Sequence, residues 1–525
     1  MKIVIAYPPL TCGKSLPAGR QGYPTLGQNR QFQYFKEPTY IYPVVPASAA
    51  TLLKLAGHEV TWLDCIAENI SYEEFIKIIQ KEKPDLIAFE TKTPVVKQHW
   101  KIIDDIKKLS TMDCRPWTVL FGDHITALPE ESFKNSSVDF VLTGGDYDFL
   151  LLNLCNWLNN SKTANRKPLT ELEPGIYYRD NGTIKNTGKF QLNHDLNKLP
   201  FIDRDLTKWQ LYAAKNGNYK RTPGTYIMSG RDCWWGKCTF CSWPTIYPAF
   251  RSRLPENVID EIGSLIDNYH VREIMDDTGC FPAGDWLKNF CRGMLKRGYN
   301  KKIYFDCNMR FGALSAEDFS LMKKANFRLL LFGLESANQS TLDRVNKNLK
   351  TERIVADCKL AVRAGLFPHI TIMFGYPWED YDDALRTLKL GKWLLKKGYA
   401  YTMQATVVIP YPGTPLFEEC KQNKRLRTLD WDDYDMKHPV MQTSVADEKI
   451  MELVQGMYGV AFQPEFILRK LSSIKDIDDV KYYLRAAKKV FGHIFDFKKT
   501  RDSAHFCKKE NSPEVGAVPT FKGVI

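Results

Sequence analysis

Hydrophobic positions in the first part of the chain fall into short apolar runs separated by amphipathic segments. Runs such as Lys2–Tyr7 and Asp85–Phe89 are typical of buried strands. Between them, Pro46–Ala56 and Trp100–Leu109 carry apolar residues at helical spacing. Buried strands that alternate with helices indicate a parallel sheet covered on both faces. We therefore expect an α/β, doubly wound, Rossmann-like domain at residues 1–158.

The pattern breaks after this domain. Asp180–Gly182 is a tight-turn signal between two short apolar segments, Gly175–Tyr178 and Thr183–Lys185, and it predicts a hairpin. The polar stretch that follows is typical of a connection between domains. We therefore expect residues 159–222 to form a linker that contains a hairpin.

A second alternation of strands and helices begins near Thr225. Its spacing is that of a TIM barrel with two units missing, which predicts a partial (β/α)6 TIM-like barrel at residues 223–425. Residues 426–525 are charged and helical in pattern, and we expect a mainly helical extension. The six strands expected in the barrel are Thr225–Ser229, Glu273–Asp276, Ile303–Cys307, Leu329–Phe332, His369–Phe374 and Thr402–Ile409.

Composition limits the kinds of protein that this chain could be. The 525 residues are 44% hydrophobic and 26% charged, which suits two or three domains with ample core. The formal net charge of +12 is spread along the chain. It favours attraction of anionic cofactors, and a nucleic-acid partner is not expected. No apolar run approaches the roughly 20 residues of a membrane span, and no secretory signal is recognisable, so we expect a cytoplasmic protein.

Three cysteines, Cys233, Cys238 and Cys241, lie within nine residues of one another just after the first expected barrel strand. Thiolates packed this closely are typical ligands of a soft metal centre. Three ligands would leave one iron of an iron–sulfur cube open to a further molecule. Part of a zinc site, or a cysteine trio with one redox pair, are the alternatives. Neither a His at finger spacing nor a second Cys-x-x-Cys pair follows, which favours iron–sulfur over zinc.

Small and polar residues also follow several strands of the first domain. Parallel sheets bind ligands at the carboxyl ends of their strands, so these loops favour a ligand site. Tight turns also require Gly and Asp, and this is the alternative explanation for each loop taken alone. The candidate residues are Thr91, Gly122, Asp123, His124, Gly144 and Gly145.

The cysteine run at the start of a partial barrel resembles the radical SAM superfamily. That family has Cys-x3-Cys-x2-Cys, whereas four residues, Trp234–Lys237, fill the first gap here, and Gly236 eases the extra bend. Further segments resemble the family at the ends of later strands, including Phe374–Glu379, which is similar to its Gly-x-Pro-x-Glu segment. The resemblance implies that the cosubstrate S-adenosylmethionine contacts Asp276, Asp277, Thr278, Arg310, Glu335, Ser336 and Gly375.

Two of these residues have plain structural alternatives. Arg310 could form an ion pair at a strand end. Glu335 could be a carboxylate at a helix start. Catalytic residues proper are not identified by the sequence.

The first domain resembles the cobalamin-binding domain found ahead of radical SAM barrels. The resemblance rests on Tyr7–Pro9, Gly122–Glu130 and Val138–Gly145. The Asp-x-His-x-x-Gly motif that gives cobalt a histidine ligand in some cobalamin proteins is absent. The resemblance therefore implies cobalamin bound without a protein histidine on cobalt.

Together the resemblances imply a radical SAM enzyme. A [4Fe–4S] cluster on the three cysteines would cleave S-adenosylmethionine to a 5′-deoxyadenosyl radical, and cobalamin would serve methylation of an unactivated carbon. The partners implied are a small-molecule or peptide substrate and a low-potential electron donor such as flavodoxin or ferredoxin. Two alternatives stay open: a ring-forming or rearrangement enzyme on the same cofactors, and a non-catalytic, metal-bearing nucleic-acid-binding protein.

Overall fold

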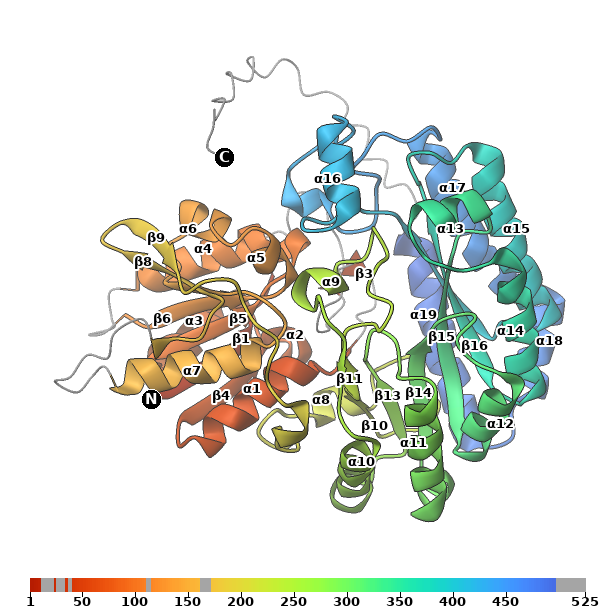
Figure 1. Ribbon diagram of the computed structural model, residues 1–525, viewed down its shortest axis with the longest axis horizontal. Coiled ribbons are helices and arrows are strands. Elements are labelled where there is room, and N and C mark those ends of the chain that lie inside the picture. The colour runs from red at the N-terminus through yellow and green to blue at the C-terminus, as the bar shows by residue number, and fades with distance from the viewer. Residues whose placement is uncertain (11–22, 25–33, 36–39, 110–114, 161–170, 497–525) are drawn as a thin grey trace.

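The chain folds into two lobes with a layer of helices along the outer side of the second (Figure 1). The first lobe holds the N-terminal sheet, and the second holds the barrel and the C-terminal helices. The computed structural model describes residues 1–10, 23–24, 34–35, 40–109, 115–160 and 171–496.

The first sheet is seven-stranded, in the order β4-β1-β5-β6-β7-β8-β9. The first five strands in this order are parallel, while β8 and β9 run antiparallel to their neighbours. The hairpin expected inside the linker therefore continues the first sheet, because β8 pairs with β7. The strands are β1 (Lys2–Tyr7), β4 (Glu59–Asp64), β5 (Leu86–Glu90), β6 (Trp117–Phe121), β7 (Phe140–Leu142), β8 (Ile176–Asp180) and β9 (Thr183–Asn186). A separate antiparallel pair joins β2 (Tyr23–Pro24) and β3 (Tyr34–Phe35).

Helices cover both faces of this sheet, which confirms the doubly wound arrangement. Figure 1 shows α1 and α7 side by side on one face and α4 on the other. Their buried faces supply Val45, Leu53, Ile103 and Leu151 to the core. The helices are α1 (Val44–Leu55), α2 (Cys65–Glu68), α3 (Tyr72–Glu82), α4 (Val96–Lys107), α5 (Asp123–Ala127), α6 (Glu131–Asn135) and α7 (Tyr147–Asn160).

The second lobe is an open half-barrel, as the spacing predicted. Its six parallel strands follow one another in chain order. They are β10 (Gly224–Ile227), β13 (Glu273–Asp276), β14 (Tyr304–Met309), β15 (Phe327–Glu335), β16 (Phe367–Phe374) and β17 (Thr402–Val407). The connecting helices are α8 (Gln210–Ala213), α9 (Trp243–Ile246), α10 (Pro255–Tyr269), α11 (Asp285–Lys296), α12 (Ala316–Lys324), α13 (Gln339–Arg344), α14 (Thr351–Arg363), α15 (Tyr381–Lys397) and α16 (Pro415–Gln422).

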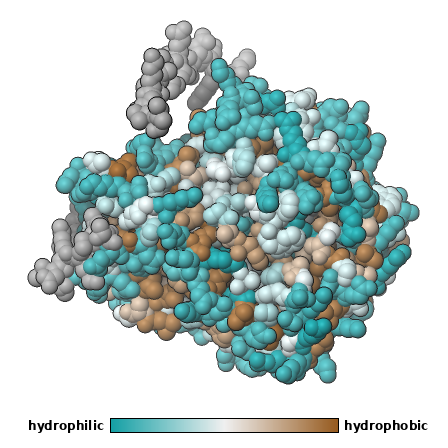
Figure 2. Space-filling model, in the orientation of Figure 1, coloured by the Kyte–Doolittle hydropathy of each residue, from teal (hydrophilic) through white to brown (hydrophobic). Residues whose placement is uncertain are grey.

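The C-terminal extension is mainly helical over its described part, to Asp496. It comprises α17 (Asp447–Tyr458), α18 (Pro464–Ser472) and α19 (Ile477–Asp496), and α17 packs against α15 and the edge strand β17. None of the helices described has the length and apolar character of a bilayer span. On the face shown in Figure 2, hydrophilic residues predominate and hydrophobic ones form separate small groups.

The two lobes meet through a buried ionic cluster, which we call the interdomain clamp: Asp146, Asp148, Arg231, Arg251 and His194. Both arginines come from a short antiparallel ribbon of β11 (Gly230–Arg231) and β12 (Arg251–Ser252) at the barrel mouth. Asp146 directly precedes α7, and Asp148 lies in the first turn of that helix. Arg231 lies 2.7 Å from Asp146 and 2.5 Å from Asp148, and Arg251 lies 2.6 Å from Asp146.

His194 completes the clamp from the connection between the lobes. Its Nδ1 lies 3.1 Å from Asp146, and its Nε2 lies 2.9 Å from the carboxylate of Glu173. The ring stacks on Phe149 at a centroid separation of 4.0 Å. Burial alone would lower the pKa of His194, but the hydrogen bonds to Asp146 and Glu173 outweigh burial and raise that pKa to about 9. At neutral pH the ring is therefore a cation.

This raised pKa predicts that the protein loses stability as the pH becomes alkaline. Because the pKa of His194 is higher in the folded chain than its ordinary value of 6.5, its contribution is fully present below about pH 6.5. The contribution is lost as pH rises through about 9. We expect His194→Gln to cost on the order of 2 kcal/mol at pH 7 and to flatten the decline in thermal midpoint between pH 7 and pH 10. His438→Gln, at an exposed position, is the control, and equal pH slopes in wild type and His194→Gln would contradict the assignment.

Candidate cluster and cofactor site

The three predicted cysteines lie on one loop, residues 232–250, that the β11–β12 ribbon closes. All three are free thiols at half-buried positions. Gly236 adopts a positive φ of 59°, so the extra residue in the first gap is accommodated as a left-handed bend. The backbone N–H of Cys241 donates to the carbonyl of Cys238 at 3.2 Å, which makes the second half of the motif a compact turn.

The thiols differ in their protonation. A hydrogen bond from Cys280 lowers the pKa of Cys233 to about 6. Burial raises the pKa of Cys238, although the positive charges of Lys347 and Arg310 act in the opposite direction. Burial also raises the pKa of Cys241. Within the described residues, no three His, Cys, Asp or Glu side chains already stand in the arrangement of a metal site, so the three-thiol centre stays a prediction from the spacing.

Two buried cations lie beside the loop. Arg310 follows β14 and donates to the carbonyl of Lys347 at 2.5 Å. Its guanidinium lies 5.5 Å and 4.9 Å from the ring centroids of Trp234 and Trp235. Lys347 forms an ion pair of 2.6 Å with Glu335, at the end of β15. Both cations are 8% exposed.

This set of residues fits a cluster held by three thiolates. Such a centre is anionic, and anions near positive side chains in a half-buried site are stabilised. Arg310 supplies that charge from the end of β14 and Lys347 from the segment after α13. Arg310 contacts the carbonyl of Lys347 and two indoles and forms no carboxylate ion pair among the described residues, unlike the strand-end ion pair raised as its alternative. Glu335 has a positive φ of 62° and does not start a helix. The indoles of Trp234 and Trp235 donate to backbone carbonyls, which fixes the loop around them.

Residues at the end of β13 hold the strand that leads into the cysteine loop. Asp276 accepts hydrogen bonds from the backbone and hydroxyl of Ser229, at 2.8 and 2.5 Å. Thr278 bonds to both backbone groups of Gly230. Burial raises the pKa of Asp276 to about 6, and the bonds to Ser229 and Thr278 oppose that shift. Asp276 and Thr278 therefore hold the strand that enters the loop, while Asp277 lies between them, fully buried.

Ser336 and Gly375 make contacts within the barrel wall. The Ser336 hydroxyl donates to Glu379 at 2.6 Å and accepts from Asn338. Gly375 has a positive φ of 92°, and a side chain there would lie 3.3 Å from Ile450 of α17. The Tyr376 hydroxyl, next to Gly375, is buried and has no hydrogen-bond partner among the described residues.

At the carboxyl edge of the first sheet the structure shows a buried polar cluster that the sequence did not single out. Glu90 accepts hydrogen bonds from Tyr7, Lys92 and Tyr147, the last two at 3.0 and 3.1 Å. The side chains of Glu90 and Lys92 are each 1% exposed. Burial raises the pKa of both tyrosines well above their usual range, so both stay neutral. The only sequence signal was two charged residues at the end of an apolar strand.

Two predicted residues of this edge, Thr91 and Gly122, lie where two neighbouring loops come into close contact. Gly122 has a φ of 131°, and a side chain there would lie 2.2 Å from the carbonyl oxygen of Thr91, so only glycine fits. The Thr91 hydroxyl is buried and has no hydrogen-bond partner among the described residues. Thr91 is thus the residue of this edge best suited to take a ligand's hydrogen bond.

Asp123 and His124 are committed to contacts inside the protein. Asp123 accepts from the N–H of His124 at 2.7 Å, and burial raises its pKa. The ring nitrogens of His124 lie 3.2 Å from Thr93 and 3.0 Å from Glu131. Glu131 in turn accepts from the indole of Trp431 at 2.8 Å. His124 therefore helps to dock the C-terminal region on the first domain.

Gly144 and Gly145 make room for aromatic rings. A side chain at Gly144 would lie 2.5 Å from the ring of Phe190, and one at Gly145 would lie 1.8 Å from that of Tyr247. Tyr247 belongs to the cysteine loop. Gly145 thus allows that loop to approach the first domain, whereas Gly144 makes room for Phe190 of the segment between the lobes.

Comparisons with known proteins agree with this geometry. Residues 227–391 match the family model of the Radical SAM superfamily. An uncharacterized methyltransferase of Pyrococcus horikoshii is 26% identical over 424 residues, which are 80% of this chain and 86% of the relative.

Solved structures share the two-lobed architecture. TsrM from Kitasatospora setae, a radical S-adenosylmethionine methyltransferase solved with cobalamin and a [4Fe-4S] cluster, is 13% identical with a TM-score of 0.65. The match covers 94% of this chain and 99% of that one. OxsB, a cobalamin-dependent S-adenosylmethionine radical enzyme, is 15% identical with a TM-score of 0.65, covering 94% of this chain and 72% of that one. The cysteine loop, the half-barrel and the family match together confirm the resemblance drawn from the sequence: residues 227–391 match the Radical SAM superfamily.

Proposed function

We propose that this protein is a cobalamin-dependent radical SAM methyltransferase. The observation that carries the proposal is the position of the cysteine loop. It lies at the barrel mouth, beside the buried cations Arg310 and Lys347, and its far end touches the carboxyl edge of the first sheet at Gly145. A cluster on this loop and a corrin at this edge would face one another.

Cys233, Cys238 and Cys241 would hold the [4Fe–4S] cluster, and Thr91 with the loop at Gly122 would meet the cobalamin. When bound, these groups supply the electron that cleaves S-adenosylmethionine and the carrier for its methyl group. The chain's own residues bind and orient: Lys347 and Arg310 offer positive charge to the carboxylate of the cosubstrate, and Trp234 and Trp235 restrict solvent around the loop. Asp276 and Thr278 keep the loop in register by bonding to Ser229 and Gly230.

Methyl transfer is favoured over ring formation and rearrangement because the Pyrococcus relative, which this chain matches over most of its length, is named a methyltransferase. A non-catalytic nucleic-acid-binding role is not favoured, because the match to the superfamily covers the cysteine loop and four whole barrel strands, β13 to β16. We further propose a small-molecule or peptide substrate, a low-potential donor such as flavodoxin or ferredoxin, and a cytoplasmic setting, since a cluster with an open iron needs reducing conditions.

Anaerobic reconstitution tests the proposal. The full-length protein, supplied with iron, sulfide and hydroxocobalamin, should bind both groups. With a strong reductant it should convert S-adenosylmethionine to 5′-deoxyadenosine and to S-adenosylhomocysteine. Formation of S-adenosylhomocysteine separates methyl transfer from the other radical reactions. Zinc in place of iron, or iron without cleavage of S-adenosylmethionine, would refute it.

Replacement of one cysteine tests the ligand assignment. We expect Cys238→Ala to lose the visible absorption of the cluster and to reduce 5′-deoxyadenosine formation to background, because two thiolates cannot hold the cube. Far-UV circular dichroism should be unchanged, since Cys238 is only half-buried. Cys358→Ala, a buried thiol in α14, is the matched control and should keep both signals. A variant at Cys238 that still cleaves S-adenosylmethionine contradicts the assignment.

The role of the buried lysine can be tested by binding. We expect Lys347→Gln to weaken S-adenosylmethionine binding to the reconstituted protein by about tenfold, the loss of one charge-assisted hydrogen bond. Lys347→Arg should recover part of the affinity. Lys350→Gln, three residues away at an exposed position, is the control. Unchanged affinity in Lys347→Gln, measured by equilibrium dialysis, would exclude this contact.

A further inference from the structure

The ribbon that closes the cysteine loop brings two like charges together. Arg231 and Arg251 are cross-strand partners in the β11–β12 pair. Arginines directly opposite one another repel, and a two-residue ribbon has few hydrogen bonds with which to resist that repulsion. The ribbon therefore requires a shared anion, and the first domain provides it.

Asp146 and Asp148 supply this anion from one turn. Asp146 accepts from Arg231 at 2.7 Å and from Arg251 at 2.6 and 2.9 Å. Asp148 accepts hydrogen bonds from both terminal nitrogens of Arg231, at 2.9 and 2.5 Å. This bidentate contact fixes the direction of the guanidinium. Arg231, Asp146 and Asp148 are at most 3% exposed. Pairs this buried are costly to break, because one charge is then left without a partner.

The far end of the loop docks on the same turn. The N–H of Gly145 donates to the carbonyl of Ile246 at 2.9 Å, and the hydroxyl of Tyr247 donates to the carbonyl of Gly145 at 3.1 Å. The ring of Tyr247 fills the space that a side chain at Gly145 would need. Both ends of the segment that carries the three cysteines are thus attached to residues 145–148 of the first domain.

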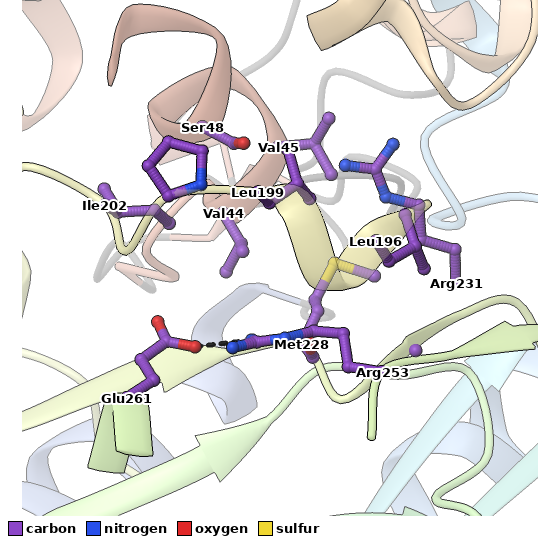
Figure 3. Close-up of a pocket in the computed structure, with 12 residues that line it drawn as sticks. Val44, Val45, Ser48, Leu196, Leu199, Ile202, Met228, Arg231, Arg253 and Glu261 are labelled. Carbon is purple, nitrogen blue, oxygen red and sulfur yellow. Dashed lines mark hydrogen bonds and ion pairs between the residues drawn. The ribbon is translucent and has the colours of Figure 1, made fainter. Parts of the chain in front are cut away.

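The interface next to the ribbon is closed. Figure 3 shows the cavity there, which has a volume of about 40 Å³ and is lined by α1, the connection between the lobes and the ribbon. That volume holds a water molecule or two and no cofactor. In the same view Arg253 runs to Glu261, whereas the guanidinium of Arg231 lies away from that pair. Arg231 is thus left for Asp146 and Asp148.

We propose that the interdomain clamp is a positioning device that fixes the cluster-binding loop to the cobalamin-binding edge. The inference rests on the proposed function for the identity of the two groups. Asp146 and Asp148 act through Arg231 and Arg251, which lie just outside the loop, and touch neither group themselves. The barrel supports the entry of the loop through Ser229 and Gly230, and the first domain attaches both of its ends through Arg231, Ile246, Tyr247 and Arg251.

The test compares two clamp variants with a matched interdomain pair. Asp148→Asn removes the charge that faces Arg231 without changing the volume of the side chain. Arg231→Lys keeps the positive charge but removes the fork, and it serves if Asp148→Asn does not fold. Lys97→Gln is the control, because Lys97 also joins the lobes, 2.7 Å from Asp430, but is 39% exposed. Each full-length protein is studied as purified and after reconstitution with iron and sulfide.

Hydrogen exchange followed by mass spectrometry is the first readout. Amides of residues 232–250 should exchange at least tenfold faster in Asp148→Asn, about threefold faster in Arg231→Lys and at the wild-type rate in Lys97→Gln. The second readout is the electron paramagnetic resonance spectrum of the reduced cluster with S-adenosylmethionine. It should change from one species to a mixture in Asp148→Asn and be partly restored in Arg231→Lys.

Loop protection and a spectrum that match wild type in Asp148→Asn would overturn the proposal. Faster exchange spread evenly over both lobes would also overturn it, because the clamp would then hold the two domains together without acting on the loop in particular. If wild-type protein binds no iron, the proposed function fails. In that case the exchange of residues 232–250 in the purified variants still decides whether the clamp holds the loop.

Discussion

Buried charge between the lobes is the constraint on which the rest of this structure depends. Asp146 and Asp148 neutralise two arginines at the base of the cysteine loop, and His194 brings a third positive charge to Asp146 and Glu173. In a water-excluded site, such charges are tolerated only when each has a partner of opposite sign. The arrangement fixes both the distance and the direction between the two domains at the base of the cysteine loop.

Buried charges of opposite sign are also placed together at the barrel mouth, beside the candidate cluster. Arg310 reaches the loop from the end of β14 and Lys347 from the segment after α13, and their charges act on Cys238. Glu335 holds Lys347, and the carbonyl of Lys347 holds Arg310, so the two cations are fixed relative to one another. Positive charge is thus built into the site before any anion is bound. This is the electrostatic setting that an anionic cluster and the carboxylate of a cosubstrate require.

Glycines at the edge of the first sheet make room for other parts of the protein. Gly122 admits the carbonyl of Thr91, and Gly144 and Gly145 admit the rings of Phe190 and Tyr247, while their contact with a cofactor stays a prediction. A glycine reports that something comes close to the backbone, and the sequence does not say what. The hydroxyl of Thr91 and the buried pair of Glu90 and Lys92 are the polar groups that this edge offers.

The sequence by itself determined the class of both lobes, the six barrel strands and the cysteine motif, because these follow from short-range periodicity and spacing. It also indicated Arg310 and Glu335, which lie at strand ends where a barrel collects its functional groups. Tertiary structure alone decided the rest. Asp146 lies 85 residues from Arg231 and 105 from Arg251, and Cys280 approaches Cys233 from the loop that follows β13. Pairings of this kind leave no local pattern, since they depend on how two separately predictable domains are set against one another.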